Sequence, residues 1–164
     1  MSSMFNECKN LTYIDLSNFD TSMVTDMSNM FFKCEKLTSL NLSNFNTPSL
    51  KKMKEMFEKC LELKTIDITS FNTSLVTDMG NLFYECIKLS QINISNFKTI
   101  SVKNLKCMFY SCISLTSLIG INSFDTSSVT DMMSLFKNCT LLTSLNLSNF
   151  NTKSLTDMTS MFSD

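Results

Sequence analysis

The sequence contains no His and no Arg, so all 14 of its basic residues are Lys. Because His is the usual general base, proton shuttle and metal ligand near neutral pH, its absence excludes chemistry that depends on an imidazole. The 14 basic residues are balanced by 15 acidic ones, and they form no dense basic face of the kind that duplex nucleic acid requires. We therefore expect no nucleic-acid partner.

The chain also lacks any segment that would insert into a membrane or direct export. Its first residues, MSSMFNECKN, do not combine a positively charged start with an apolar stretch, and no run approaches about 18 consecutive apolar residues. The apolar content is 43% over 164 residues, which is enough for one packed domain. The composition thus predicts a folded, soluble chain without direct membrane insertion.

What the sequence does contain is an internal repeat. The motif Met/Leu-Phe-x-x-Cys recurs every 26 residues, with one step of 27, and defines the units 4–29, 30–55, 56–81, 82–107, 108–134 and 135–160 and the start of a seventh. One column is always Phe and another is always Thr: Phe19, Phe45, Phe71, Phe97, Phe124 and Phe150, and Thr21, Thr47, Thr73, Thr99, Thr126 and Thr152. A fixed period with fixed apolar columns predicts that residues 1–164 form a single solenoid whose turns stack on one another.

Each unit combines two hydrophobic periodicities. The segment Leu40–Leu42 alternates apolar and polar residues, as a short strand with one buried face does. The apolar residues from Val24 to Cys34 recur at the spacing of one helical face. We therefore predict an α/β solenoid with one short parallel strand and one short helix per 26-residue turn. Because helices are bulkier than strands, the parallel sheet should lie on the concave face.

The single 27-residue unit has its extra residue between Leu118 and Phe124, where the step is six residues instead of five. Gly120 lies in this stretch, and the chain contains only two Gly. Since Gly tolerates positive φ, we predict a bulge that interrupts the polar face of the sheet at Ile119 and Gly120.

The repeats resemble those of a known family. Segments such as MFFKCEKLTSLNLSNFNT and SFDTSSVTDMMSLFKNC look like the 26-residue repeat of bacterial surface proteins and lipoproteins, a branch of the BspA-like leucine-rich repeats. This resemblance implies a right-handed leucine-rich-repeat solenoid displayed on the cell surface, with adhesion or partner binding as its role. The sequence departs from the common leucine-rich frame at Phe45, which stands where a ladder Asn is usual, with Asn44 one position earlier.

Cysteines form the next regular feature. Six of the seven occupy one column on the predicted helix, and only Cys107 lies outside it. We interpret the column as a ladder of buried thiols that act as small apolar groups. Disulfides between adjacent turns are less favoured, because neighbours on the helix side are expected more than about 7 Å apart. Zinc is less favoured because there is no CxxC pair, and Cys107 is predicted to be the most reactive thiol.

The predicted concave face is the candidate binding site for a protein or glycan ligand, because its outward residues form a flat polar surface with few charges. The alternative is that these residues only keep the sheet soluble. Two of the carboxylates lie two turns apart, roughly 10 Å by strand spacing, which nears the separation in inverting glycosidases. An open ladder gives neither carboxyl a desolvated pocket, so we expect no catalytic site, metal or cofactor. The candidate residues are Tyr13, Asp15, Asn41, Asp67, Gln91, Asn93 and Asn146.

A second candidate surface is an aromatic patch on the outer side of the predicted helices. Tyr84 and Tyr110 occupy the same column in adjacent units, and Phe32 lies two units before Tyr84. Exposed aromatics at neighbouring turns would mark a contact patch, and edge-to-face packing between them is the alternative.

We predict a non-enzymatic protein- or glycan-binding repeat module within a surface-exposed, adhesin-like protein. The sequence shows no signal peptide, lipobox or cell-wall anchor, and free Cys residues are typical of reducing compartments. An intracellular scaffold or structural spacer in the cytoplasm is therefore the alternative. The chain starts and stops inside the repeat motif, which predicts a longer array or end-to-end self-association through uncapped repeats.

Overall fold

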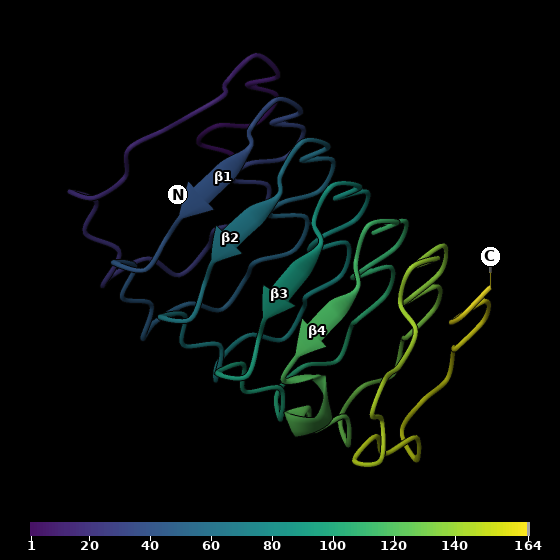
Figure 1. Cartoon of the computed structure of the whole chain (residues 1–164). Coiled ribbons are helices and arrows are strands. Elements are labelled where there is room, and N and C mark those ends of the chain that lie inside the picture. Colours follow the sequence, from purple (N-terminus) through teal and green to yellow (C-terminus); the bar gives the residue numbers. More distant parts are fainter. Residues whose placement is uncertain (164) are drawn as a thin grey trace.

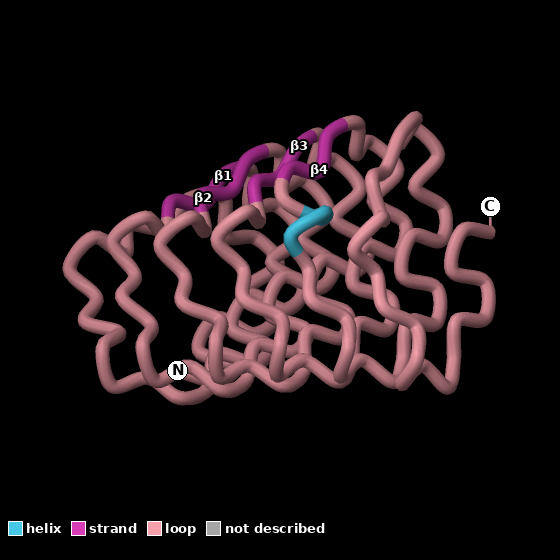
Figure 2. The backbone as a smooth tube through the Cα atoms, turned by 90° about the horizontal axis from the view of Figure 1, so that it is seen from below, coloured by secondary structure: helices cyan, strands magenta, loops and turns pink. Residues whose placement is uncertain are grey.

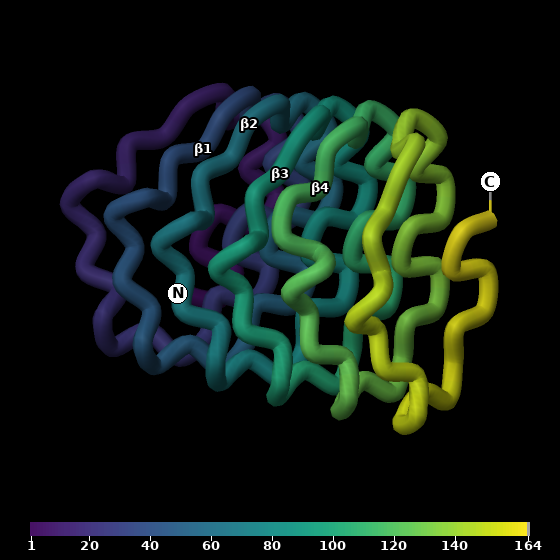
Figure 3. Tube along the Cα trace, turned by 60° about the horizontal axis from the view of Figure 1, so that its bottom comes forward, coloured from purple at the N-terminus to yellow at the C-terminus, as the bar shows by residue number. Residues whose placement is uncertain are grey.

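Residues 1–163 are described by a computed structural model, in which the chain winds into a stack of coils, one for each repeat (Figure 1). The coils follow one another in sequence order along the stack, as the colour gradient of Figure 3 shows. Residues one repeat apart therefore become neighbours in space, and the rings of Phe31 and Phe57 stack with centroids 5.9 Å apart. The prediction of a repeat solenoid is confirmed.

Four short strands lie side by side on one face of the stack, which we call the strand face (Figure 2). Each pairing is parallel and joins residues one repeat apart, such as Leu40 with Ile66 and Ile92 with Leu118. β1 pairs with β2 and β3 with β4, but no pairing within residues 1–163 joins β2 to β3. The predicted continuous sheet is thus two separate two-stranded sheets. The strand bounds are β1 Ser39–Asn41, β2 Thr65–Asp67, β3 Gln91–Asn93 and β4 Ser117–Ile119.

The prediction of a helix in every repeat is wrong. Within residues 1–163 the only helical element is the short 3₁₀ helix η1, Ile121–Ser123. The segment from Met27 to Cys34 makes two successive turns instead, each closed by a bond from its fourth N–H to its first carbonyl, at 3.2 and 3.0 Å. The third residues of these turns, Asn29 and Lys33, have φ values of 57° and 54°. A left-handed residue at that place is what a type II turn requires.

Turns replace the helix because their backbone groups pair with the neighbouring coil. The N–H groups of Met27, Phe31 and Lys33 donate to carbonyls of the next coil, at 2.9, 2.9 and 2.7 Å. We call this side of the stack the turn face, and parallel bridges follow it from Asp26 to Asp157. Both faces are therefore linked from coil to coil by backbone hydrogen bonds. The helical bulk that was expected to make the sheet concave is missing.

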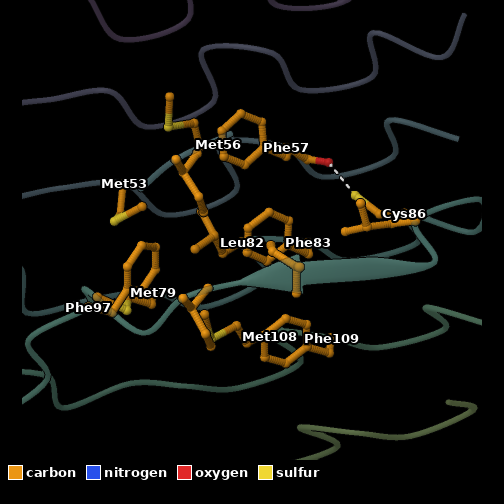
Figure 4. Close-up of a cluster of buried hydrophobic side chains, with 14 of the residues drawn as sticks. Met53, Met56, Phe57, Met79, Leu82, Phe83, Cys86, Phe97, Met108 and Phe109 are labelled. Atoms are coloured by element: carbon orange, nitrogen blue, oxygen red, sulfur yellow. Dashed lines mark hydrogen bonds between the residues drawn. The ribbon is translucent and has the colours of Figure 1, made fainter. Parts of the chain in front are cut away.

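The core is formed between coils. Phe57, Phe83 and Phe109 lie one above another in Figure 4, with ring centroids 5.4 and 5.6 Å apart. In the invariant Phe column, Phe45 and Phe71 stack at 5.9 Å with an interplanar angle of 4°. These rings are buried, as expected for fixed apolar columns in stacked turns. Each repeat thus buries its apolar side chains against its neighbours.

Two polar columns also join the coils. The hydroxyl of Thr21 donates to the carbonyl of Asn46 in the next coil at 2.8 Å. One position before the Phe column, the amide of Asn44 donates to the carbonyl of Leu16 in the preceding coil at 3.1 Å, and Ser70 and Asn96 make the equivalent contact, so this column mixes Asn with Ser. A buried hydroxyl without a partner is costly, so the hydrogen bond from the Thr hydroxyl to the next coil explains why the Thr column does not vary. The same contact is made by Thr47, Thr73, Thr99 and Thr126.

The extra residue of the fifth repeat is accommodated after β4, at Gly120 and the short 3₁₀ helix η1, and not by a bulge within the strand pair. Gly120 has a φ of 97° and directly precedes η1. A Cβ at this position would overlap the backbone of Ser95 in the preceding coil, so only glycine allows the coils to approach there. The predicted irregularity at Gly120 is confirmed, but the predicted bulge is wrong, because Ile119 still pairs in register with Asn93.

Candidate functional site

The predicted binding residues lie on the strand face. Asn41 ends β1, Asp67 ends β2, and Gln91 and Asn93 bound β3. Parallel pairing places Asn41 directly beside Asp67. Tyr13, Asp15 and Asn146 occupy the matching positions of the first and sixth coils, which carry no strand, and they are exposed. Their role in binding stays a prediction.

One side-chain oxygen of each Asn or Asp in this set holds the turn that follows the strand position. Asp15 Oδ1 accepts the N–H of Ser17 at 2.9 Å, and Asn41 Oδ1 accepts the N–H of Ser43 at 3.0 Å. Such turns orient the side chain and leave its second polar atom free. The same contact is made by Asp67, Asn93 and Asn146.

The two carboxylates of the strand face are held in their ionised form. Hydrogen bonds from the backbone and hydroxyl of Ser17 lower the pKa of Asp15, and those from the hydroxyl and backbone of Thr69 lower the pKa of Asp67. A general acid needs the opposite shift, which burial would supply. Both side chains are exposed, so neither carboxyl is prepared to donate a proton near neutral pH.

A shallow depression of about 250 Å³ crosses the strand face where β2 and β3 are unpaired. Thr65, Asp67 and Gln91 line it, together with Asn93 and Ile119. Sequence reasoning missed Ile119 as a site residue, although the irregular spacing around Gly120 was the available signal. Its side chain is 50% exposed, at a column where five other coils carry Asn or Asp.

The outer aromatic patch is only partly assembled, and it lies on the turn face. The rings of Tyr84 and Tyr110 stack in parallel with centroids 4.6 Å apart and an interplanar angle of 5°, so the edge-to-face alternative is wrong. Phe32 does not join them, because Glu58 takes the same column in the coil between. Lys59 Nζ lies 5.9 Å from the centroid of the Tyr84 ring.

Glu58 was not expected to be buried. The residue is only 9% exposed, and its Oε2 accepts a hydrogen bond from Asn81 Nδ2 at 3.1 Å. Burial raises the pKa of Glu58, while the bond from Asn81 opposes that shift. No sequence signal marked this residue, since the character of its column varies from Phe32 and Tyr84 to Lys137.

The thiols are free, and they differ in access. Burial raises the pKa of Cys34 to about 12 and that of Cys139 to about 11. Cys107 is also buried, at 7% exposed, and burial raises its pKa, so the prediction that Cys107 is the most reactive thiol is wrong. Cys8 is the exposed member of the column. The helices that were expected to hold the Cys residues of adjacent turns too far apart for disulfides are absent. All seven Cys are nevertheless free thiols.

Within residues 1–163, no cluster of three or more Cys, Asp or Glu is placed to hold a metal ion. No helix in the same part of the chain is long and apolar enough to cross a membrane.

Comparison with known proteins gives a family. No curated protein and no solved structure matched the chain. A family model described as a Mycoplasma protein of unknown function, DUF285, matches residues 1–118 and again residues 88–164. The two matches together extend over the whole sequence. The chain therefore belongs to the DUF285 family of Mycoplasma proteins.

Proposed function

We propose that this chain is a non-enzymatic binding module that takes a protein or glycan ligand on its strand face. The observation that carries the proposal is the row of Asn and Asp side chains on that face. One oxygen of each side chain fixes a turn, as in Asp67 and Asn93. The second polar atom of the side chain is then available to hydrogen-bond with a ligand. A row of pre-oriented donors and acceptors lowers the ordering cost of binding.

The state of the carboxylates favours binding over catalysis. Asp15 and Asp67 are exposed and their pKa values are lowered by hydrogen bonds. Catalytic carboxyl pairs differ in protonation because their surroundings differ. Both carboxyls here are exposed and ionised, so they suit recognition of polar or cationic groups.

We further propose that the repeats are a BspA-like leucine-rich-repeat variant in a surface-exposed, adhesin-like protein. The 26-residue period and segments such as LTSLNLSNFNT support this assignment. The second candidate is an intracellular scaffold or spacer, which the seven free Cys favour, since free thiols are typical of reducing compartments.

A binding screen tests the proposed function. The labelled chain is applied to immobilised matrix proteins and to a glycan array, alongside the strand-face variant Gln91→Lys. Thr77→Lys is the matched control, because it makes the same charge change outside the strand face at a column where the chain itself carries Lys51 and Lys103. We expect binding that Gln91→Lys weakens and Thr77→Lys does not. No binding, or equal weakening by both variants, would contradict the proposal.

The cellular location of the protein distinguishes the surface-exposed protein from the intracellular scaffold. Protease treatment of intact source cells should remove the protein if it is surface-exposed. Full protection on intact cells, with digestion after lysis, would instead favour the intracellular scaffold.

A further inference from the structure

We infer that the depression between β2 and β3 is a docking site for an extended peptide that presents a basic side chain next to an aliphatic one. This inference rests on the proposed function and narrows it to one place on the strand face and one class of ligand.

Asp67 and Asn93 are each oriented by two hydrogen bonds from the turn that follows the strand. Asp67 Oδ1 accepts both the N–H and the hydroxyl of Thr69, at 3.0 and 2.7 Å. Asn93 Oδ1 accepts both the N–H and the hydroxyl of Ser95, also at 3.0 and 2.7 Å. For Asn41 and Asn146, only the contact with the N–H is present.

The free atoms of this pair complement a peptide. Asp67 Oδ2 and Asn93 Nδ2 have no hydrogen-bond partner within residues 1–163, and they come from consecutive coils on either side of the depression. The first is an anionic acceptor and the second is a donor. A lysine ammonium or arginine guanidinium fits the carboxylate, and a main-chain carbonyl fits the amide.

Ile119 supplies the apolar contact at the edge of the same depression. It replaces the Asn or Asp of the other coils and is 50% exposed. Its position is fixed by Gly120, whose backbone packs directly against Ser95. A half-exposed aliphatic side chain beside two oriented polar groups is the usual composition of a small contact patch between proteins.

The lining favours a peptide over a glycan. Asp67 is the only charged residue in the depression, so a cationic ligand gains attraction there and an anionic one is repelled. The lining contains no aromatic ring on which a sugar could stack. An aliphatic and basic peptide therefore matches Asp67, Asn93 and Ile119 together.

Titration of the full ¹⁵N-labelled chain tests the inference. The probe is an acetylated, amidated peptide of sequence Thr-Val-Lys-Val-Thr, and the comparison probes are the same peptide with Glu in place of Lys and a neutral oligosaccharide, maltotetraose. We expect saturable shifts of the backbone amides of 65–69, 91–95 and 119 with the Lys peptide alone. Asp67→Asn and Ile119→Asn, which install residues that the row already uses, should each weaken binding about fivefold or more.

Asp20→Asn is the matched control, because it makes the same charge change at an exposed turn that is not part of the candidate binding row, at a column where the chain itself carries Asn46 and Asn72. It should leave the affinity unchanged. Equal binding of the Glu peptide, binding of maltotetraose at these amides, or no saturable shift with the Lys peptide would overturn the inference. Shifts centred on another part of the strand face would overturn it while leaving the proposed function standing, whereas failure of the binding screen would remove the proposed function itself.

Discussion

The thiol of Cys86 donates a hydrogen bond to the backbone carbonyl of Phe57 in the preceding coil, at 3.1 Å (Figure 4). A thiol is a weak donor, but here it pairs with a carbonyl on the side of the stack where a helix was expected. The Cys column therefore links successive coils as the Thr column does. The same contact is made by Cys34, Cys60, Cys112 and Cys139.

Cys86→Ala should lower the free energy of unfolding by about 1 to 2 kcal/mol, because it removes buried volume and the bond to Phe57. Urea denaturation monitored by circular dichroism measures the change. Cys8→Ala is the control, since Cys8 is exposed and its loss should change stability by less than about 0.5 kcal/mol. Equal effects of the two substitutions would show that the thiol column does not support stacking.

Thiol access gives a second prediction. In the native protein a thiol reagent should label Cys8 rapidly and the other six Cys only after unfolding, because six are buried and the thiolate is the reactive form. Cys8→Ser should remove the rapid phase. Rapid labelling of six or seven groups would contradict the buried ladder, and rapid labelling of Cys107 would restore the original expectation for that residue.

The period and the core columns could be predicted because identical side chains recur at identical places. A residue repeated every 26 positions, such as Phe45, must face the same environment in each coil. The irregularity at Gly120 was predictable for the opposite reason, since Gly120 and the single 27-residue unit depart from an otherwise regular pattern.

The turns could not be distinguished from a helix by apolar spacing. Two successive turns return Met27, Met30, Phe31 and Cys34 to the same buried side, as one helical face would. The left-handed columns contain Glu and Lys as well as Asn, and only Asn is enriched in that conformation. One signal was present, because the sequence has no Ala, the residue with the highest helix propensity.

The burial of Glu58 predicts a pH dependence. Its pKa is raised in the folded state, so its favourable contribution is present below the unfolded value of about 4.5 and is lost as pH rises through the folded value. Glu58→Gln stays neutral and should retain the bond to Asn81. The variant should therefore melt at a higher temperature than the parent at pH 7, and at the same temperature at pH 4 and below.

Glu7 provides a control of opposite sign for this experiment. A hydrogen bond and ion pair with Lys33, at 3.1 Å, lower the pKa of Glu7. Its contribution is thus present above the unfolded value and is lost as pH falls. Glu7→Gln should not raise the melting temperature at pH 7. A rise for both variants would mean that removal of negative charge, rather than burial of Glu58, causes the effect.

The two glycines are constrained in different ways. Backbone atoms of a neighbouring coil restrict Gly120, and side-chain atoms restrict Gly80. Gly120→Ala should lower the free energy of unfolding by about 3 kcal/mol or more, because its φ of 97° is unfavourable for Ala and its Cβ would overlap the backbone of Ser95. Gly80→Ala places its Cβ 2.9 Å from Nδ2 of Asn104, the end of a side chain that can rotate away. It should therefore cost less than about 1 kcal/mol. Urea denaturation of both variants measures the difference, and similar costs would mean that the coil at Gly120 can relax and that Ile119 is not held in place by it.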